Sequence, residues 1–190
     1  MKNKIFSLIK KDLYRYNGTT KFSNFVINIL FNRGFKITVF YRIGNSISKN
    51  NIFFPLYKSL YILIQNKFTI NLPLSTKLGI GIYIGHAFAI AINKNVVIGN
   101  NVNISQCVTI GEKQTGKKAG VPTIGNNVYI GPGSIIIGAI HISDGAVIGA
   151  GSVVTSDVPQ NAVVAGVPAK ILSYKGSEGI VNNKVFINVS

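Results

Sequence analysis

The sequence is poor in acidic residues and in cysteine. Its 190 residues include 20 lysines and arginines but only 5 aspartates and glutamates, so the formal net charge is +15. This excess of positive charge favours an anionic partner, such as nucleic acid, an acidic membrane or a phosphorylated ligand. Cys107 is the only cysteine, which excludes an internal disulfide bond and indicates a reducing compartment.

Several functional signatures are missing from the sequence. No helix-turn-helix pattern, zinc-finger spacing or aromatic-rich recognition strand occurs, so nucleic acid is not an expected partner. Two isolated histidines and one cysteine do not provide the ligand spacing of a metal site within one chain. No Gly-x-Ser-x-Gly nucleophile elbow is present, and the apolar run after Met1 is too short for a signal peptide. We therefore expect a cytoplasmic protein that uses no metal.

The positive charge is concentrated in the first 70 residues, which contain twelve lysines and arginines and one acid, Asp12. Apolar residues with helical spacing predict three helices in this region, at residues 21–33, 35–48 and 52–67. Gly34 is expected to end the first of these helices, and Pro55 to lie in the first turn of the third. The helices should cover one end of the structure that follows. A basic, aromatic-rich helical surface also suits peripheral contact with the anionic inner face of the plasma membrane.

A six-residue period organises the rest of the chain. Large aliphatic residues recur at this interval, at Ile124, Ile130, Ile136, Ile142, Ile148 and Val154. A helix repeats every ~3.6 residues and a strand every ~2, so a sustained period of six marks a parallel β-helix. The same period runs upstream in two other frames, at residues 72–90 and 92–110. Residues 112–123 interrupt it with a polar, glycine-containing segment that predicts a loop.

These patterns predict a mainly β protein, in which a parallel β-helix is preceded by a short α-helical N-terminal region. We divide the chain into a basic helical region at residues 1–70, a hexapeptide-repeat domain at residues 71–171, and a C-terminal tail at residues 172–190. Residues 185–189 of the tail are compatible with a short strand and with a loose segment.

His86 is the strongest candidate for a catalytic residue. It lies just before the period slips by two residues, between Ile90 and Ile92, where we expect a cleft between neighbouring prisms. Histidine titrates near neutral pH and can therefore act as a general base. The other histidine, His141, has no comparable setting and is predicted to lie on the surface. Cys107 is predicted to be a small packed side chain.

The end of the repeat region resembles a known family. The run Ile148-Gly-Ala-Gly-Ser-Val-Val154, followed by Asp157-Val-Pro159 and by Ala165-Gly-Val-Pro-Ala-Lys-Ile171, is similar to the hexapeptide-repeat acyltransferases. This resemblance implies that the β-helix is left-handed. It also implies a homotrimer with active sites between subunits.

Within this family, residues 70–170 resemble the serine O-acetyltransferases, and more specifically their relatives in polysaccharide gene clusters. Tyr83-Ile-Gly-His86 is similar to the segment that carries the general base, and Gln106-Cys-Val-Thr-Ile-Gly111 to the segment that meets the active-site loop. The resemblance implies an acyltransferase that uses acetyl-CoA as its cosubstrate and needs no metal.

The resemblance also implies a role for each candidate residue. His86 would remove the proton from an acceptor hydroxyl as its oxygen attacks acetyl-CoA, and Asn71 would fix the tautomer of the imidazole. Backbone N–H groups around Gly111 and Glu112 would stabilise the oxyanion. The other candidates are small residues along the pantetheine arm and lysines near the phosphates: Gly131, Ala150, Gly151, Lys117, Lys118 and Lys170.

Three departures from the serine acetyltransferase pattern bear on the acceptor. Asn71 and Gly85 stand where those enzymes carry aspartates, and Gly120-Val121 replaces an Arg-His pair. In the family these positions orient the base or hold the charged groups of serine. Their loss favours an uncharged sugar hydroxyl as acceptor, in surface-polysaccharide or glycolipid biosynthesis. Serine O-acetyltransferase activity in cysteine biosynthesis is the first alternative, and a noncatalytic membrane-associated scaffold is the second.

Overall fold

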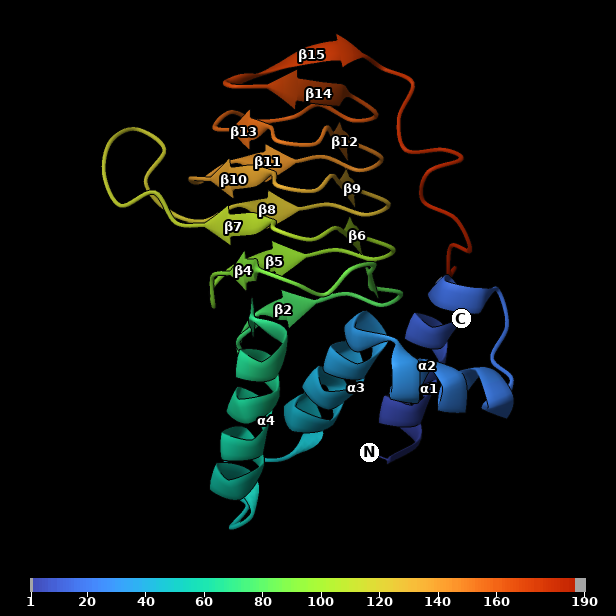
Figure 1. The fold of residues 1–190 in the computed structure, drawn as a ribbon. Helices are drawn as coiled ribbons and strands as arrows, with labels where there is room; N and C mark the ends of the chain where they lie inside the picture. The colour runs from blue at the N-terminus through green and yellow to red at the C-terminus, as the bar shows by residue number, and fades with distance from the viewer. Residues whose placement is uncertain (1, 187–190) are drawn as a thin grey trace.

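The computed structural model describes residues 2–186 and combines a helical end with a stack of short strands (Figure 1). The helices are α1 (Lys2–Asn17), α2 (Phe22–Phe31), α3 (Arg33–Ser46) and α4 (Phe54–Phe68). The strands are β1 (Ile70–Asn71), β2 (Lys77–Leu78), β3 (Tyr83–Ile84), β4 (Ile90–Ile92), β5 (Val97–Ile98), β6 (Asn103–Ile104), β7 (Thr109–Gly111), β8 (Thr123–Ile124), β9 (Tyr129–Ile130), β10 (Ile135–Ile137), β11 (His141–Ile142), β12 (Val147–Ile148), β13 (Val153–Val154), β14 (Val163–Gly166) and β15 (Ala169–Ser173).

The strands form three parallel sheets, which are the three faces of a prism. Their orders are β1-β4-β7-β10-β13, β2-β5-β8-β11 and β3-β6-β9-β12-β14-β15. Up to β13 each sheet takes every third strand of the chain, as a coil with three flat faces requires, whereas β14 follows β12 in the third sheet. Among the strands of residues 2–186, only the last pair, β14 and β15, is antiparallel. The predicted parallel β-helix is therefore confirmed.

The length of each coil explains the changes of frame in the sequence. Ile84 pairs with Ile104, twenty residues later, because the slip between β3 and β6 adds two residues to three repeats of six. Ile104 pairs with Ile130, twenty-six residues later, because the loop adds eight. Ile130 then pairs with Ile148, eighteen residues later, as three uninterrupted repeats require. All four side chains are buried in the interior, so each inserted residue is accommodated at a corner.

The junction between α2 and α3 differs from the prediction. α2 ends at Phe31, and the side-chain oxygen of Asn32 accepts the N–H of Phe35 at 3.0 Å, which caps α3. The prediction that Gly34 ends a helix is wrong, because Gly34 lies in the first turn of α3. A Cβ at this position would lie 1.8 Å from the carbonyl oxygen of Ile84. Gly34 therefore allows α3 to lie directly on the backbone of β3.

A buried ion pair joins the helices to the first coil. The Nε of Arg42, in α3, lies 2.8 Å from the Oδ2 of Asp12, in α1, and both side chains are buried. The N–H of Ile82 donates to Asp12 at 3.0 Å, and Arg42 donates to the carbonyl oxygen of Gly79 at 2.5 Å. Burial raises the pKa of Asp12, whereas Arg42 and the N–H of Ile82 act to lower it.

Residues 174–186 return along the β-helix to the helical end (Figure 1). Asn101 exchanges two hydrogen bonds with the backbone of Val185, at 2.8 and 2.9 Å. Arg15, in α1, donates to the carbonyl oxygen of Asn182 at 2.5 Å. Up to residue 186 this segment forms no strand, and it is held by these side chains and by a backbone hydrogen bond of 2.9 Å from Gly176 to Asn161. Residues 187–189 of the tail lie outside the described residues.

Candidate active site

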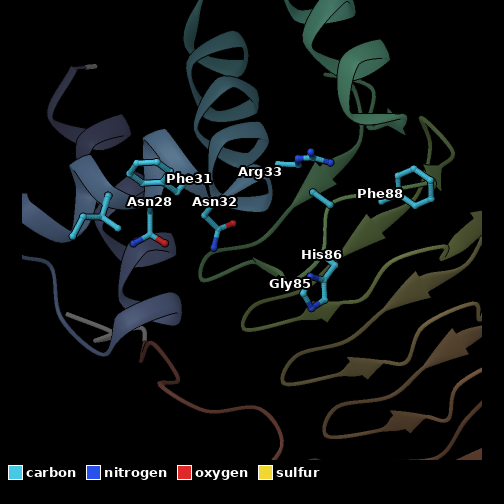
Figure 2. Close-up of a pocket in the computed structure, with 9 residues that line it drawn as sticks. Asn28, Phe31, Asn32, Arg33, Gly85, His86 and Phe88 are labelled. Carbon is cyan, nitrogen blue, oxygen red and sulfur yellow. The ribbon is translucent and has the colours of Figure 1, made fainter.

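His86 lies on the turn after β3 and lines a cavity of about 620 Å³ (Figure 2). Its side chain is exposed, so the imidazole can meet a molecule that enters the cavity. The turn contributes one wall and the α2–α3 junction the opposite wall. The complete lining consists of Ile27, Asn28, Phe31, Asn32, Arg33, Gly85, His86, Ala87 and Phe88.

The helical wall offers three polar side chains to this cavity. The amide nitrogen of Asn28 donates to the Oδ1 of Asn17 at 2.6 Å and to the carbonyl oxygen of Asn24 at 2.8 Å. Its Oδ1 is therefore the atom that can accept from a ligand. The Oδ1 of Asn32 is already used to cap α3, which leaves its NH₂ group to donate. Arg33 is exposed and is the one permanently charged side chain among the lining residues.

A column of small residues leads away from the cavity along one corner of the prism. The residues that follow β3, β6, β9 and β12 are Gly85, Ser105, Gly131 and Gly149. Each donates its backbone N–H to a carbonyl of the next coil, at 2.8–3.2 Å. Since adjacent strands lie about 4.8 Å apart, the column from Gly85 to Gly149 is about 14 Å long. A Cβ on Gly131 would lie 2.7 Å from the carbonyl oxygen of Ile148, so this edge of the prism is bare backbone.

The structure brings the predicted acetyl-CoA residues of the repeat region to this same corner. Ala150 and Gly151 are exposed and directly follow the small-residue column. Lys170 lies on β15, opposite Ala165 of β14, at the end of the column farthest from His86. Gly131, Ala150, Gly151 and Lys170 therefore share a corner with the candidate base, and their binding roles stay predictions.

The loop that begins at Glu112 leaves the prism at a different corner, between β7 and β8 (Figure 1). Lys113 and Gly120 exchange two backbone hydrogen bonds of 2.8 and 2.9 Å across it. The Nζ of Lys118 lies 2.6 Å from the Oδ2 of Asp157, and this hydrogen bond holds the pKa of Asp157 below its usual value. Gly111 ends β7, so within one chain the loop and the turn that carries His86 lie at opposite ends of the sheet that contains β4 and β7.

Three other candidates lie away from the cavity or differ from expectation. Asn71 is exposed on β1, where it pairs with Ala91, and among residues 2–186 no hydrogen bond joins it to His86. His141 is exposed on β11, as predicted. The prediction that Cys107 is packed is wrong. It is exposed at a corner with a φ of 59°, and its N–H donates to the carbonyl oxygen of Phe88 at 2.9 Å.

The residues that the sequence analysis missed are Asn28, Asn32 and Arg33. They come from a helix pair that folds back onto the turn after β3, and no local pattern reveals this contact. One signal was available, because Asn28 and Asn32 are four residues apart on an otherwise apolar segment and so share a helix face. Within residues 2–186, no group of three histidine, cysteine or acidic side chains is arranged to hold a metal ion.

Known proteins match both the sequence and the fold. Residues 122–156 match the family model described as bacterial transferase hexapeptide (six repeats). The serine acetyltransferase of Salmonella typhimurium is 38% identical over 156 residues, which are 79% of this chain and 55% of the relative. A soybean serine acetyltransferase solved in complex with serine is 32% identical with a TM-score of 0.76, and the match covers 90% of this chain and 70% of that one. A serine acetyltransferase solved in complex with CoA is 30% identical with a TM-score of 0.71, over 90% and 70% of the two chains.

These similarities bear on two predictions. The fold match confirms the left-handed parallel β-helix with helices at its N-terminal end. The prediction of a saccharide acceptor in polysaccharide biosynthesis is wrong, because the similar proteins are serine acetyltransferases. The chain spans about half the length of the curated relative it matches, 55%.

Proposed function

This chain belongs to the serine acetyltransferases among the hexapeptide-repeat transferases, and on that premise we propose that it transfers acetyl from acetyl-CoA to the hydroxyl of L-serine. The observation that carries the proposal is the position of His86. It lies exposed in a cavity with an arginine on the opposite wall, at the foot of a small-residue column. Such a site can hold a small charged acceptor beside an extended thioester.

We propose that neutral His86 acts as the general base. It accepts the proton of the serine hydroxyl as that oxygen attacks the thioester carbonyl. The tetrahedral intermediate then expels the CoA thiolate, which takes this proton from the imidazolium. No covalent bond to the protein forms in this sequence. The products, a thiol and an ester, balance the reactants, a thioester and an alcohol.

Arg33 is our candidate for the group that holds the carboxylate of serine. The departure at Gly120-Val121 leaves that carboxylate without the Arg-His pair that the family resemblance implies. Arg33 offers a planar guanidinium suited to a carboxylate, and the NH₂ group of Asn32 can add a second donor. The Oδ1 of Asn28 can accept from the ammonium group.

The acetyl-CoA would lie along the small-residue corner. Gly131, Ala150 and Gly151 leave room for the pantetheine arm against the backbone. Lys170 is the best-placed cation for the phosphates, because the column ends beside it. Lys118 is already paired with Asp157, and Lys117 remains available in the loop.

We infer that the active site is completed between subunits of a homotrimer. The predicted oxyanion donors, at Gly111 and Glu112, lie on a different corner from His86 of the same chain. A neighbouring subunit can bring its loop to the His86 cavity. Mixing His86→Ala subunits with subunits shortened within residues 113–120 should therefore restore part of the activity that each variant lacks alone. Absence of any restoration would place the whole site within one chain.

The test of the activity measures free thiol released from acetyl-CoA with L-serine. The wild type should turn over serine, and His86→Ala should lower kcat by about 10²–10⁴-fold. His141→Ala is the matched control, because it removes the other histidine from an exposed position on β11, and it should keep wild-type activity. No turnover by the wild type, together with no thermal stabilisation by acetyl-CoA, would favour the noncatalytic scaffold over an enzyme.

Recognition of serine is tested separately with Arg33→Gln. This change should raise KM for serine about tenfold or more, with little change in KM for acetyl-CoA. Lys36→Gln removes another cation from the same helix, outside the His86 cavity, and should leave both values unchanged. Equal KM values for serine in the two variants would exclude Arg33 as the carboxylate partner.

The cytoplasmic location and the peripheral contact with an anionic membrane remain predictions that follow from the charge and the single cysteine. No helix within residues 2–186 has both the length and the apolar character to cross a bilayer. Any membrane contact of these residues would therefore be made at the surface.

A further inference from the structure

The helix α4 carries a row of exposed apolar side chains, which we call the α4 stripe: Ile52, Phe53, Leu56, Leu60 and Leu63. Leu56, Leu60 and Leu63 are three and four residues apart, so they lie on one helix face. Their exposure is high, with 71% of Leu56 and 65% of Leu63 accessible, and Ile52 just before the helix is 85% accessible. No described element covers this face.

The opposite face of α4 packs against the rest of the chain. Tyr61 and Phe68 are buried, and the hydroxyl of Tyr61 donates to the carbonyl oxygen of Leu72 at 2.8 Å. The C-terminal end of α4 lies at the first coil of the prism, and the rest of the helix extends away from the prism (Figure 1). The α4 stripe is therefore not part of the core of one chain, and it forms the outer side of the helical end.

A cationic groove lies beside the α4 stripe, on the α2–α3 side of the helix. Its volume is about 440 Å³. Its cations are Arg33, Lys36 and Lys67, and no acidic residue lines it. Arg33 and Lys36 both lie about 6 Å from the ring centroid of Phe68, at 6.0 and 5.9 Å. An apolar row beside converging cations is the arrangement that suits acyl chains below phosphate groups.

Two large partners could cover this surface, a second copy of the chain or a lipid membrane, and their charge decides between them. A second copy could meet this surface with the same face or, in a threefold assembly, with another face. In either case it brings a chain with 20 lysines and arginines against 5 acids, and its residues 1–70 contain twelve lysines and arginines against the single acid Asp12. Asp12 is buried and paired with Arg42, so it cannot offset the repulsion between copies. An anionic lipid surface supplies the missing negative charge.

We propose that the α4 stripe and the cationic groove beside it dock the protein on an anionic membrane surface. The apolar side chains enter the boundary between headgroups and acyl chains, and the lysines meet lipid phosphates. This proposal goes beyond the transfer of acetyl to serine and does not depend on it, because the α4 stripe, Lys36 and Lys67 lie outside the catalytic cavity, although Arg33 lines both the cavity and the groove.

The test is sedimentation of the full chain with vesicles, at about 0.1 M salt. Wild type should bind vesicles with 30% phosphatidylglycerol in phosphatidylcholine and bind pure phosphatidylcholine at least about tenfold more weakly. Leu56→Ser/Leu63→Ser should weaken binding to the anionic vesicles by about tenfold or more. The matched control is Leu172→Ser/Tyr174→Ser, which removes side chains that are 67% and 62% exposed at the other end of the prism, and it should bind like wild type.

A second pair of variants tests the charge. Lys36→Gln/Lys67→Gln should also reduce binding to anionic vesicles, and raising the salt should reduce the binding of wild type. Inorganic phosphate at the same ionic strength should not release the protein, because a free phosphate does not occupy the α4 stripe. Melting temperatures and serine turnover equal to wild type would show that each variant is folded.

Three results would overturn the proposal. They are equal binding to neutral and anionic vesicles, full binding by Leu56→Ser/Leu63→Ser, and a smaller assembly in solution for that variant without vesicle binding by wild type. The last result would assign the α4 stripe to contact between copies of this chain. None of these results depends on whether serine is the acceptor.

Discussion

The β-helix and the helical end solve the same problem by different means. In the β-helix each coil covers the next, so the backbone groups of β6, β9 and β12 are paired on both sides. The first coil has no coil below it, and its backbone groups need other partners. The helices supply these partners from side chains. Tyr16 exchanges hydrogen bonds of 3.0 and 3.1 Å with both backbone groups of Ile84.

The same pattern recurs across the junction. Asp12 accepts from the N–H of Ile82, Arg42 donates to the carbonyl oxygens of Leu78 and Gly79, and Tyr61 donates to that of Leu72. An edge of unpaired backbone is thus closed by long polar side chains that the helices carry. The difference teaches that the repeat region depends on periodic aliphatic packing, whereas its capped end depends on a few buried polar residues.

The largest effect should come from breaking the buried ion pair. Asp12→Asn keeps the shape of the side chain but leaves Arg42 charged and buried without a counterion. We expect the free energy of unfolding to fall by about 3–5 kcal/mol, measured by urea denaturation. Asp144→Asn is the control, because the exposed Asp144 accepts from Asn126 on the outside of the prism, and it should cost less than about 1 kcal/mol. Equal losses would mean that the junction does not depend on the ion pair.

A core substitution in the β-helix should have the next largest effect. Ile136 is fully buried within the prism, and Ile136→Ala should lower the free energy of unfolding by about 2–4 kcal/mol. Leu56→Ala on the exposed side of α4 is the comparison and should change it by less than about 0.5 kcal/mol. A large loss for Leu56→Ala in the isolated protein would show that α4 is covered in solution.

Gly34→Ala tests the close approach of α3 to β3. The new Cβ would lie 1.8 Å from the carbonyl oxygen of Ile84, so the helix must shift, and we expect a loss of about 2 kcal/mol despite the better helix propensity of alanine. In Gly111→Ala the new Cβ would meet its nearest atom at 3.6 Å, and stability should change little. A neutral Gly34→Ala would contradict the direct contact between α3 and the first coil.

The smallest effect concerns the loop and depends on pH. The pKa of Asp157 is lowered, chiefly by the hydrogen bond from Lys118, so the contribution of this pair to stability is present above pH ~4 and is lost as the pH falls through the lowered pKa. Both side chains are largely exposed, so the shift in melting temperature between wild type and Asp157→Asn should be about 1–2 °C at pH 6. The two proteins should melt together near pH 2. A difference that grows as the pH falls would contradict the pairing.

The comparison of the β-helix with the helical end also explains which features of the fold could be predicted from the sequence. In the β-helix, a period of six with buried Ile84, Ile104, Ile130 and Ile148 predicted the fold and the loop. In the helical region, the third predicted helix came within two residues of α4 at its start and one at its end. The helix α1 was not predicted, although Ile5, Ile9, Leu13 and Tyr16 follow a helical period and pack in one cluster. Gly34 was misjudged because its role depends on a contact fifty residues away.

The candidate site divides in the same way. His86 was identified from its place in the repeat and from family resemblance, and the small residues at Gly131 and Gly151 follow from the turns that the coil needs. Arg33 and Asn28 were not identified, because only the packing of α2 and α3 against the turn after β3 brings them to His86. The acceptor was misjudged because charges are missing at positions within the repeats. The sequence does not show that Arg33, from the helices, reaches the His86 cavity.

The sequence by itself determined the prism, because a six-residue repeat of buried aliphatics stacks coils with flat faces and assigns each residue to a face or a corner, whereas the left hand of the coil came from the family resemblance. It also determined that His86 stands at a corner just before a change of frame. Only the tertiary structure decided what closes the first coil, which residues face His86, and which side of α4 is left uncovered. Several of those contacts join segments that are fifty or more residues apart, such as Gly34 with Ile84 and Asp12 with Ile82, and local periodicity gives no information on such contacts.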